Sequence, residues 1–434
     1  MSRSRTPRPD PRTTALDLLA AVLVDKRLLD EALDTSPTLS RLEDRDRAFA
    51  RLLVATVLRR LGQLDDVIGR CLDKGLPNKA RRARDVLRLG AAQLLFLNTP
   101  PHAAIATSVD LVKGTPLAGF AGLINAVLRR LDREGRDWVA AQDAGRLNTP
   151  DWMWQGWVAA YGEDTARAIA TAHLAEAPVV DITVAGDAAQ WAERLEAVLL
   201  PTGSLRRPAG GDITVLPGFA GGNWWVQDMG AALPARLLGD VRGKRVADLC
   251  AAPGGKALQL AVAGAIVTAV DRSAKRLVRF QQNLERLKLT SEIVEADAAA
   301  WRPAELFDAV LLDAPCTATG TLRRHPDGLR LKGPGDVAAL ADQQAALLRA
   351  SLDMLKPGGI LVYCVCSLEP QEGAAQIERL LAADATLRRA PIAADEVGGL
   401  AELISPDGDL RTLPCHLADQ GGMDAFFAAR LVKA

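Results

Sequence analysis

Two cysteines lie where apolar runs of strand length come to an end. Cys316 follows the run 307–313, and Cys366 ends the run that begins at Ile360. In open α/β sheets, ligands bind beyond the carboxyl ends of the strands. A thiolate at such a position can attack an electron-poor carbon and form a covalent intermediate. We therefore expect Cys316 and Cys366 to face one substrate pocket from two loops.

A third cysteine, Cys364, lies two residues before Cys366 and shares its face of the expected strand. Strand position alone therefore does not separate the two. Residues 367–370 leave the strand and expose Cys366, whereas a buried cysteine usually acts as a small hydrophobic side chain. We interpret Cys364 as part of the core.

Methylation of carbon 5 of a cytosine is a reaction that needs such a cysteine. That carbon accepts a methyl group only after a thiolate has added to carbon 6 and made carbon 5 enamine-like. Asp313, if it holds or shares a proton, is placed to stabilise the adduct at ring nitrogen 3. The second cysteine, Cys316, is a candidate for assisting the loss of the carbon 5 proton and the expulsion of the thiolate.

A glycine-rich turn follows the first expected strand of the same region. Residues 248–256 read DLCAAPGGK, and a helix is expected over 257–263. Glycines at such a turn let backbone amides approach a cofactor at the start of the helix. The turn matches neither GxGxxG nor GxxxxGK[ST], which argues against a dinucleotide or flavin cofactor and against a nucleoside triphosphate.

Acidic residues end three further strands: Asp271 the second, Asp297 the third and Asp313 the fourth. Asp271 can accept both ribose hydroxyls of an adenosine-containing cofactor, and Asp297 is placed to contact the exocyclic amine of the adenine. Asp271 and Asp297 each also fit a helix N-cap. Caps do not explain an acid at every strand end, so we favour a crevice that binds a cofactor.

The elements that position these residues alternate between apolar strands and helices. The strands are expected over 246–250, 266–271, 293–297, 307–313 and 360–366. This alternation predicts a parallel sheet covered by helices on both faces. Residues 410–413 and 425–432 are expected to form an antiparallel pair that closes the edge of this doubly wound, Rossmann-like domain.

The front of the chain has a different pattern. Residues from Thr13 to about Arg136 read as successive amphipathic helices, two of them separated by Pro100-Pro101. A small α/β insert follows before the main domain, and its Trp224-Trp225 pair is interpreted as core rather than as a base-stacking platform. We predict a helical domain over 1–137, a helical linker with a small α/β subdomain over 138–232, and an α/β domain over 233–434.

Bulk composition sets further bounds. Lysine plus arginine and aspartate plus glutamate both total 53, so net charge gives no hint of a nucleic-acid partner. Six scattered cysteines, four widely separated histidines and no membrane-length apolar run predict free thiols, no metal site and a cytoplasmic protein. Local basic clusters are either RNA contacts or solvated surface; they comprise Arg3, Arg5, Arg8 and Arg12; Lys79, Arg81, Arg82, Arg84 and Arg88; and Arg323, Arg324, Arg330 and Lys332. Arg323, Arg324 and His325 are also placed to hold phosphates.

The motifs together resemble a known family. Residues 248–256, residues 313–327 and Cys366-Ser367 are similar to those of the Sun/Fmu-type (RsmB-like) 16S ribosomal RNA cytosine-5 methyltransferases. Residues 100–104 and 122–129 resemble the NusB-like RNA-binding domain that these enzymes carry at the front. The resemblance therefore covers nearly the whole chain.

This resemblance implies S-adenosyl-L-methionine as the cofactor, Cys366 as the nucleophile, and Cys316 as the cysteine that assists product release, with Asp313 beside them. It implies a cofactor site made by Cys250, Ala251, Ala252, Pro253, Gly254, Gly255, Lys256, Asp271, Asp297 and Asp313. The implied partner is RNA, 16S ribosomal RNA or an assembling small subunit, with no DNA, no membrane and a monomeric protein. The target base must leave its stack, so a single-stranded loop or a locally opened helix is expected.

Some residues depart from the family pattern. Val365 stands where threonine is usual before the nucleophile, and Thr317 where serine is common after the release cysteine. Residues 177–182 lack the arginine and asparagine expected near the small subdomain. Three alternatives stay open: methylation of another RNA, a non-catalytic RNA-binding protein with a relic fold, and a small-molecule or protein methyltransferase. The pair of cysteines argues against the last two.

Overall fold

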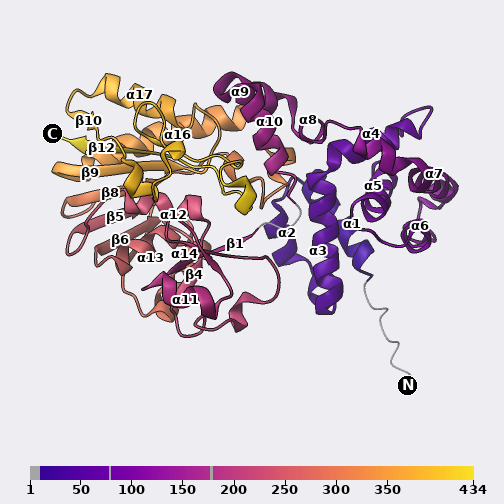
Figure 1. Ribbon diagram of the computed structural model, residues 1–434, viewed down its shortest axis with the longest axis horizontal. Helices are drawn as coiled ribbons and strands as arrows, with labels where there is room; N and C mark the ends of the chain where they lie inside the picture. Colours follow the sequence, from indigo (N-terminus) through magenta and orange to yellow (C-terminus); the bar gives the residue numbers. More distant parts are fainter. Residues whose placement is uncertain (1–9, 78–79, 176–178) are drawn as a thin grey trace. The chain divides into compact units, whose positions relative to one another are not determined.

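The computed structural model describes residues 10–77, 80–175 and 179–434. Within this range the chain forms two compact units. Of the described residues, those up to 175 together with Arg324–Lys332 form the first unit, and those from 179 to 323 together with Gly333–Ala434 form the second. Figure 1 colours both along the sequence. The basic residues Arg3, Arg5, Arg8 and Lys79 and the residues Ala177 and Pro178 lie outside the described residues.

The first unit is helical, as the amphipathic pattern predicts. Its α-helices are α1 (Pro11–Leu23), α2 (Leu29–Thr35), α3 (Asp44–Arg59), α4 (Leu61–Arg70), α5 (Arg81–Leu95), α6 (Pro101–Asp110), α7 (Ala121–Ala140), α8 (Ala144–Asn148), α9 (Asp151–Tyr161), α10 (Glu163–Ala172) and α15 (Gly328–Leu331). Pro101 takes the first position of α6, where its missing amide proton costs nothing. Gly90 lets α5 approach α7, because a Cβ there would lie 2.6 Å from Leu128 Cδ1.

Residues 324–332, including α15, pack inside this helical unit. The carboxylate of Asp327 accepts a hydrogen bond from the amide of Leu29, the first residue of α2, at 3.0 Å. Arg330 Nη2 donates to the carbonyl of Asn148 at 2.9 Å. Leu329 is buried, and Leu331 packs against the core of the unit. The segment that follows the loop of Cys316 therefore completes the helical unit.

The second unit contains two sheets. The smaller one has the order β2-β3-β1-β4, with β1 (Val180–Val184), β2 (Val198–Leu199), β3 (Leu205–Arg207) and β4 (Trp224–Val226), all antiparallel. Helix α11 (Ala188–Arg194) belongs to it, and α12 (Met229–Arg236) leads on to the larger sheet. Trp224 and Trp225 are buried, which confirms that they are core residues.

The larger sheet has the order β10-β12-β9-β8-β5-β6-β7, and β11 pairs with β12. Its strands are β5 (Arg245–Leu249), β6 (Ile266–Asp271), β7 (Glu292–Glu295), β8 (Phe307–Asp313), β9 (Leu355–Val365), β10 (Leu387–Arg389), β11 (Leu410–Arg411) and β12 (Phe427–Lys433). The strands from β9 to β7 run parallel, and β12 is antiparallel to β9. The expected antiparallel pair of β11 and β12 is confirmed, but β10 rather than this pair forms the outer edge.

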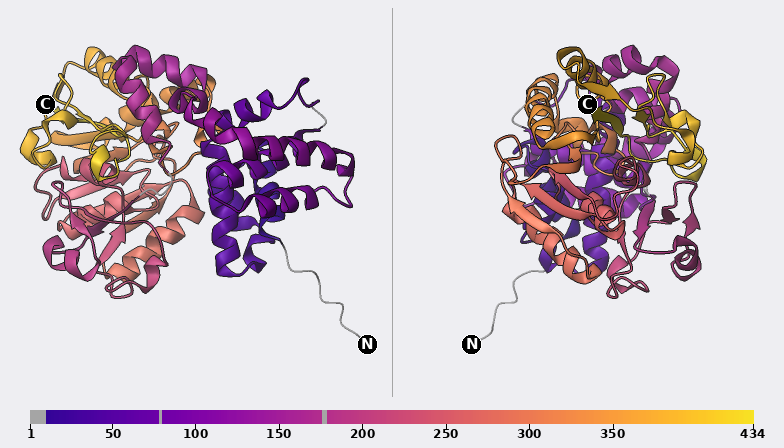
Figure 2. Two further views of the ribbon diagram at one scale, coloured as in Figure 1. Left: turned by 45° about the vertical axis from the view of Figure 1, so that its right-hand side comes forward. Right: turned by 90° about the vertical axis from the view of Figure 1, so that its left-hand side faces the viewer.

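Helices cover both faces of this sheet, which is the doubly wound, Rossmann-like arrangement expected (Figures 1 and 2). They are α13 (Gly255–Val262), α14 (Ala274–Leu287), α16 (Pro334–Asp353) and α17 (Ala374–Ala383). Alternate residues of one strand enter different cores: Val246 packs in one cluster and Ala247 in the other. The central strands are therefore buried on both sides.

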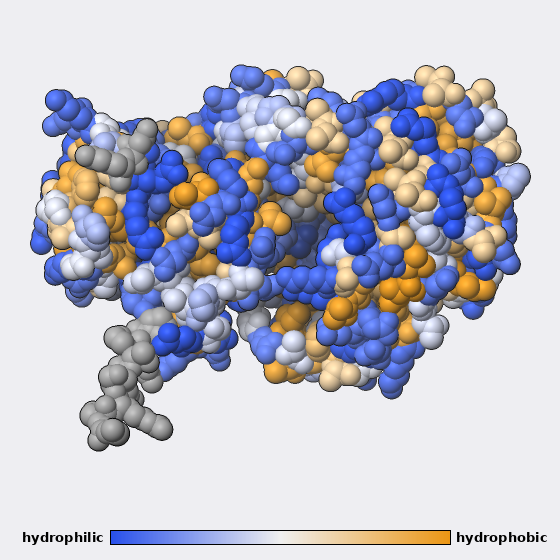
Figure 3. All heavy atoms as spheres, turned by 180° about the vertical axis from the view of Figure 1, so that it is seen from behind, coloured by the Kyte–Doolittle hydropathy of each residue, from blue (hydrophilic) through white to orange (hydrophobic). Residues whose placement is uncertain are grey.

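The surface is mixed in character. Hydrophilic residues cover much of the face seen in Figure 3, with hydrophobic residues in scattered groups. Over the described ranges, none of the helices has the length and apolar character needed to span a bilayer.

Candidate active site

The strand ends that carry the predicted residues lie side by side. Because β9, β8, β5, β6 and β7 are consecutive and parallel in the sheet, their carboxyl ends share one edge. The turn after β5 begins with Cys250, whose φ is +62°. Gly254, with a φ of +106°, directly precedes α13, and a Cβ there would lie 2.0 Å from Phe280 Cδ2. Only glycine fits this position, so the turn is shaped by its close approach to α14.

Asp271 at the end of β6 holds the glycine turn in place. Its carboxylate accepts hydrogen bonds from the amide of Ala252 at 3.1 Å and from the amide of Ser273 at 2.9 Å. Arg276 Nη1 lies 3.6 Å from the same carboxylate, and Arg276 also donates to the carbonyl of Ala252. The side chain of Asp271 is thus buried beside the turn and fixed from two loops.

A cavity at this edge brings three of the predicted cofactor residues together, namely Cys250, Asp271 and Asp297. Its other lining residues are Val270, Arg272, Arg276, Ala296, Ala298, Pro315, Gln343 and Leu347. Asp297 lies two residues beyond the end of β7 and is exposed. Its carboxylate accepts a hydrogen bond from the amide of Ala299. The pattern of strand ends did not single out Arg276 or Gln343, which are contributed by helices.

Lys256 joins the glycine turn to the end of β8. Its Nζ lies 2.7 Å from Oδ2 of Asp313 and 4.9 Å from the ring centre of Phe426. Burial acts to lower the pKa of Lys256, but the charge and hydrogen bond of Asp313, together with the nearby Cys364 and Asp248, outweigh burial, and the pKa is raised above its ordinary value. Lys256 therefore stays charged although it is only 7% exposed.

Asp248 is a fully buried carboxyl at the end of β5. Neither of its oxygens has a hydrogen-bond partner of normal geometry among the described residues. Burial first, and then the charge of Asp313, raise the pKa of Asp248 well above its usual range. Burial and the charge of Asp271 likewise raise the pKa of Cys250, to about 12. Both conditions favour the protonated, neutral forms of these groups.

The two loop cysteines meet at this edge. The Sγ atoms of Cys316 and Cys366 lie 3.4 Å apart, one in the loop after β8 and the other directly after β9. The contact with Cys366, together with burial, raises the pKa of the Cys316 thiol well above its ordinary value. Cys364 is fully buried in the core and donates to Oδ1 of Asp313 at 3.5 Å. The interpretation of Cys364 as a core residue is confirmed, and the cysteine pair is brought together as expected.

Arg323, the first residue of the basic run after Cys316, does not form an open phosphate site. Arg323 is only 1% exposed, and its guanidinium lies 3.1 Å from the carboxylate of Asp228 and 3.6 Å from that of Asp424. It also donates to the carbonyl of Gly421 at 2.5 Å. The hypothesis that Arg323 holds a phosphate is therefore wrong, because the side chain is buried and paired. Arg324 is exposed, within the segment that packs in the helical unit.

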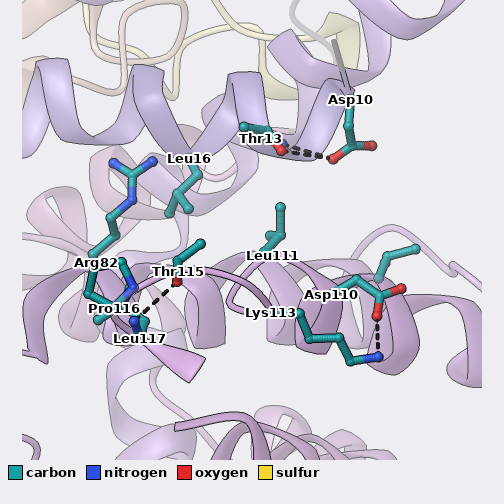
Figure 4. A pocket seen from close by; sticks show the side chains of 11 residues that line it. Asp10, Thr13, Leu16, Arg82, Asp110, Leu111, Lys113, Thr115, Pro116 and Leu117 are labelled. Carbon is teal, nitrogen blue, oxygen red and sulfur yellow. Dashed lines mark hydrogen bonds and ion pairs between the residues drawn. The ribbon is translucent and has the colours of Figure 1, made fainter. Parts of the chain in front are cut away.

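The helical unit has a cavity of its own, of about 750 Å³ (Figure 4). Arg82 and Lys113 line it, each with an acidic partner: Arg82 pairs with Asp17 at 2.6 Å, and Lys113 pairs with Asp110 at 2.6 Å. Each of these two positive charges is balanced by an acidic partner, so Arg82 and Lys113 give the cavity no surplus of positive charge.

The fold and the strand-end crevice define an S-adenosylmethionine-dependent methyltransferase. Comparison with known families agrees. Residues 235–432 match the model of the family "16S rRNA methyltransferase RsmB/F", and residues 9–133 match that of the NusB family. The chain belongs to the RsmB/F family of ribosomal RNA methyltransferases, with a NusB-type region at its front.

Curated relatives extend over nearly the whole chain. "Ribosomal RNA small subunit methyltransferase B" of Pseudomonas syringae pv. tomato is 37% identical, with 98% of this chain and 97% of the relative covered. The protein of the same description from Xylella fastidiosa is 38% identical, with 98% of each covered. The resemblance inferred from the motifs is thereby confirmed.

Two solved structures have a similar fold over about two thirds of the chain. A methyltransferase homologue from Pyrococcus horikoshii is 27% identical, with a TM-score of 0.54, 64% of this chain covered and 94% of that one. NSun6 from Pyrococcus horikoshii, solved with SFG, is 18% identical, with a TM-score of 0.57, 65% of this chain covered and 98% of that one.

Proposed function

We propose that the protein methylates carbon 5 of a cytosine in 16S ribosomal RNA through a covalent adduct of Cys366. The observation that carries this proposal is the pair of thiols 3.4 Å apart at two neighbouring strand ends. A methyltransferase acting on an oxygen, or on an exocyclic amine, needs no thiol at all. Two thiols at one edge suit a reaction with a nucleophilic attack and a separate release step.

The proposed reaction begins with attack by the thiolate of Cys366 on carbon 6 of the base. The bond from sulfur to carbon 6 forms and electron density moves into the ring. The carboxyl of Asp313, in its protonated form, donates its proton to ring nitrogen 3, which leaves carbon 5 as the nucleophilic carbon of an enamine. S-adenosylmethionine supplies the methyl group that carbon 5 takes. Loss of the proton from carbon 5 to a base then breaks the bond between sulfur and carbon 6 and frees Cys366. Cys316, 3.4 Å from that sulfur, is assigned to assist this release.

The residues of the crevice fit the cofactor. Gly254 lets the turn pack against Phe280, since a Cβ there would clash with that ring, and the cavity beside the turn is lined by Cys250, Asp271 and Asp297. In this proposal the site comprises Cys250, Ala251, Ala252, Pro253, Gly254, Gly255, Lys256, Asp271, Asp297 and Asp313. Lys256 is assigned to keep Asp313 in place through their 2.7 Å contact.

The proposed partner is RNA of the small ribosomal subunit, free or in an assembling particle. We propose that the protein acts as a monomer. The helical unit with its NusB-type region is assigned to RNA binding. The base must be presented outside a stacked helix, because the attacking thiol has to reach carbon 6 from above the ring plane.

Incubation with unmodified 16S ribosomal RNA and labelled S-adenosylmethionine tests the proposal. The wild type should place label in 5-methylcytosine. Cys366→Ala should abolish label, and Cys316→Ala should accumulate a covalent protein–RNA adduct that withstands denaturation. Cys71→Ala, in the helical unit, is the matched control and should behave as the wild type.

The other outcomes are equally informative. If the wild type binds the cofactor but leaves naked 16S RNA unlabelled, an assembling particle and other RNAs are tested next, and failure on all of them overturns the substrate proposal. If Cys366→Ala retains full activity and Cys316→Ala loses it, the roles of the two cysteines are reversed. Absence of cofactor binding would favour a non-catalytic RNA-binding protein.

A further inference from the structure

A buried glutamate joins the two cysteine loops. Glu372 is fully buried in the loop between β9 and α17, six residues after Cys366. One carboxylate oxygen, Oε1, accepts hydrogen bonds from the amide of Thr317 at 2.9 Å and from Nε2 of Gln344 at 3.1 Å. The other, Oε2, accepts from the hydroxyl of Ser367 at 2.5 Å and from the hydroxyl of Thr317. The carboxylate therefore has four donors.

The residues that Glu372 holds are the immediate neighbours of the two thiols. Thr317 follows Cys316, and Ser367 follows Cys366. The carboxylate of Glu372 thus fixes the backbone and side chain of Thr317, next to Cys316, and the side chain of Ser367, next to Cys366. Such a link sets the separation of the two sulfur atoms, because each cysteine is one peptide bond from a residue that the carboxylate anchors.

Further contacts tie the same two loops together. The amide of Gly320 donates to the carbonyl of Cys366 at 3.0 Å, and the amide of Leu368 donates to the hydroxyl of Thr319 at 2.9 Å. A Cβ at Gly320 would lie 2.3 Å from the carbonyl oxygen of Ala425, so the loop backbone is packed without spare room. Glu372 lies at the centre of an assembly whose parts cannot shift independently.

Burial of a carboxylate is costly unless strong hydrogen bonds compensate it. Glu372 makes no ion pair among the described residues, so the four hydrogen bonds alone offset the cost. A neutral glutamine of the same shape could receive the amide of Thr317 and the amide of Gln344 on its oxygen and donate to the two hydroxyls. The presence of a charge in this place therefore suggests a role beyond holding the loops.

We propose that Glu372 is a positioning residue of the reaction, which fixes Cys316 against Cys366 and brings a negative charge near the Cys316 thiol. The inference rests on the proposed function, because the roles of the two thiols are part of that function. The charge of Glu372 is among the causes that raise the pKa of Cys316, after the contact with Cys366 and burial. A neutral thiol beside Cys366 repels the departing thiolate less than a second thiolate would, and it can donate a hydrogen bond to it.

Two substitutions separate geometry from charge. Glu372→Gln keeps the shape and the hydrogen-bonding capacity, whereas Glu372→Ala removes the link altogether. Glu378→Gln is the matched control: it lies on α17, its side chain is 61% exposed, and its partner is Arg389. All variants are compared as full-length proteins for folding, for cofactor affinity and for methyl transfer to 16S RNA.

Glu372→Ala should lower kcat by about a hundredfold, the effect of a misplacement of roughly 1 Å in a reacting group, with the affinity for the cofactor unchanged. Glu372→Gln should retain more activity and move the pH profile of product release to lower pH, because Cys316 then ionises more readily. Both variants should accumulate the covalent adduct, as Cys316→Ala does. Glu378→Gln should match the wild type in every measurement.

A readout without RNA keeps this inference distinct from the proposed function. Diamide oxidises two neighbouring thiols to a disulfide and is itself reduced to the hydrazine, and peptide mass spectrometry then identifies the Cys316–Cys366 pair. This pair should form quickly in the wild type and in Glu372→Gln and more slowly in folded Glu372→Ala. If pairing is as fast in Glu372→Ala and the pH profile of Glu372→Gln is unchanged, the inference is overturned. A wild type that forms the pair but methylates no cytosine would instead overturn the proposed function alone.

Discussion

Lys256 Nζ and Asp313 Oδ2 lie 2.7 Å apart and connect the glycine turn after β5 with the end of β8. The ammonium group is almost entirely buried, whereas about a third of the carboxylate side chain is exposed. The pair thus joins the residues assigned to the cofactor with the strand that leads to Cys316. A change to either residue should therefore affect both the glycine turn and the end of β8.

Asp313→Asn tests this link, because it leaves a buried ammonium without its charged partner. Removing one member of a buried pair costs about 3–5 kcal/mol, and the partial exposure of Asp313 reduces the expected loss of unfolding free energy to about 2 kcal/mol. The double variant Asp313→Asn/Lys256→Met should recover much of that stability but none of the activity. Chemical unfolding of the second unit measures the change in stability, and a methyl-transfer assay measures the change in activity. A loss in the double variant equal to the sum of the losses in Asp313→Asn and in Lys256→Met alone would show that the two residues do not interact.

Gly254 in the cofactor turn and Gly335 outside it offer a matched pair of glycines. Gly254→Ala should weaken cofactor binding severely, because its φ of +106° disfavours a side chain and the new Cβ would meet Phe280 at 2.0 Å. Gly335→Ala is the control, since Gly335 lies exposed in α16, outside the proposed cofactor site, and an added Cβ there would meet nothing within 4 Å. Isothermal titration with S-adenosylmethionine measures both. Similar affinities for the two variants would place the cofactor elsewhere.

Much of this site follows from local pattern. Apolar runs of strand length predict β5, β6, β8 and β9, and parallel strands necessarily bring their carboxyl ends to one edge. For that reason Cys316 and Cys366 could be expected together before any contact was known. The burial of Cys364 also follows from its place inside the strand, one residue before its end.

Other features depend on contacts between residues far apart in the chain. Glu372 lies in a loop without periodicity, and its partners Thr317 and Gln344 are 55 and 28 residues away. Arg323 belongs to a basic run that resembles a phosphate site, but Asp228 and Asp424, near in space only, neutralise it. Local sequence contains no record of such pairs, so neither could be foreseen. The predicted domain boundaries at 137 and 232 remain a prediction.

Asp327 offers a test of how residues 324–332 complete the helical unit. Its carboxylate accepts from the amide of Leu29 at the start of α2, a capping contact supplied from 298 residues away. Asp327→Ala should lower the unfolding free energy of the helical unit by about 1–2 kcal/mol, as loss of an N-cap does. Asp73→Ala is the control: its side chain is exposed after α4, so the change should be within about 0.5 kcal/mol. Thermal unfolding followed by circular dichroism compares them, and equal melting temperatures would exclude the cap.

Asp409 gives the clearest dependence of stability on pH. The residue is 1% exposed, directly before β11, with Arg389 Nε 3.3 Å from its carboxylate. Burial raises the pKa of Asp409 to about 6 in spite of this cation, from an ordinary value of 3.8. The folded protein therefore binds the proton more tightly than the unfolded chain. The stability that Asp409 contributes is fully present below about pH 4 and is lost as the pH rises through about 6.

Asp409→Asn imitates the protonated form at every pH, and its effect should therefore depend on pH. The variant should melt at the same temperature as the wild type near pH 4 and higher at pH 8. The difference at pH 8 corresponds to at most about 3 kcal/mol, from a pKa difference of about two at 1.36 kcal/mol each. Asp419→Asn, at an exposed aspartate that is not among the groups that shift the pKa of Asp409, should leave the pH dependence unchanged. Parallel melting curves for Asp409→Asn and wild type across this range would mean that Asp409 stays ionised in the folded protein, with Arg389 outweighing the cost of burial.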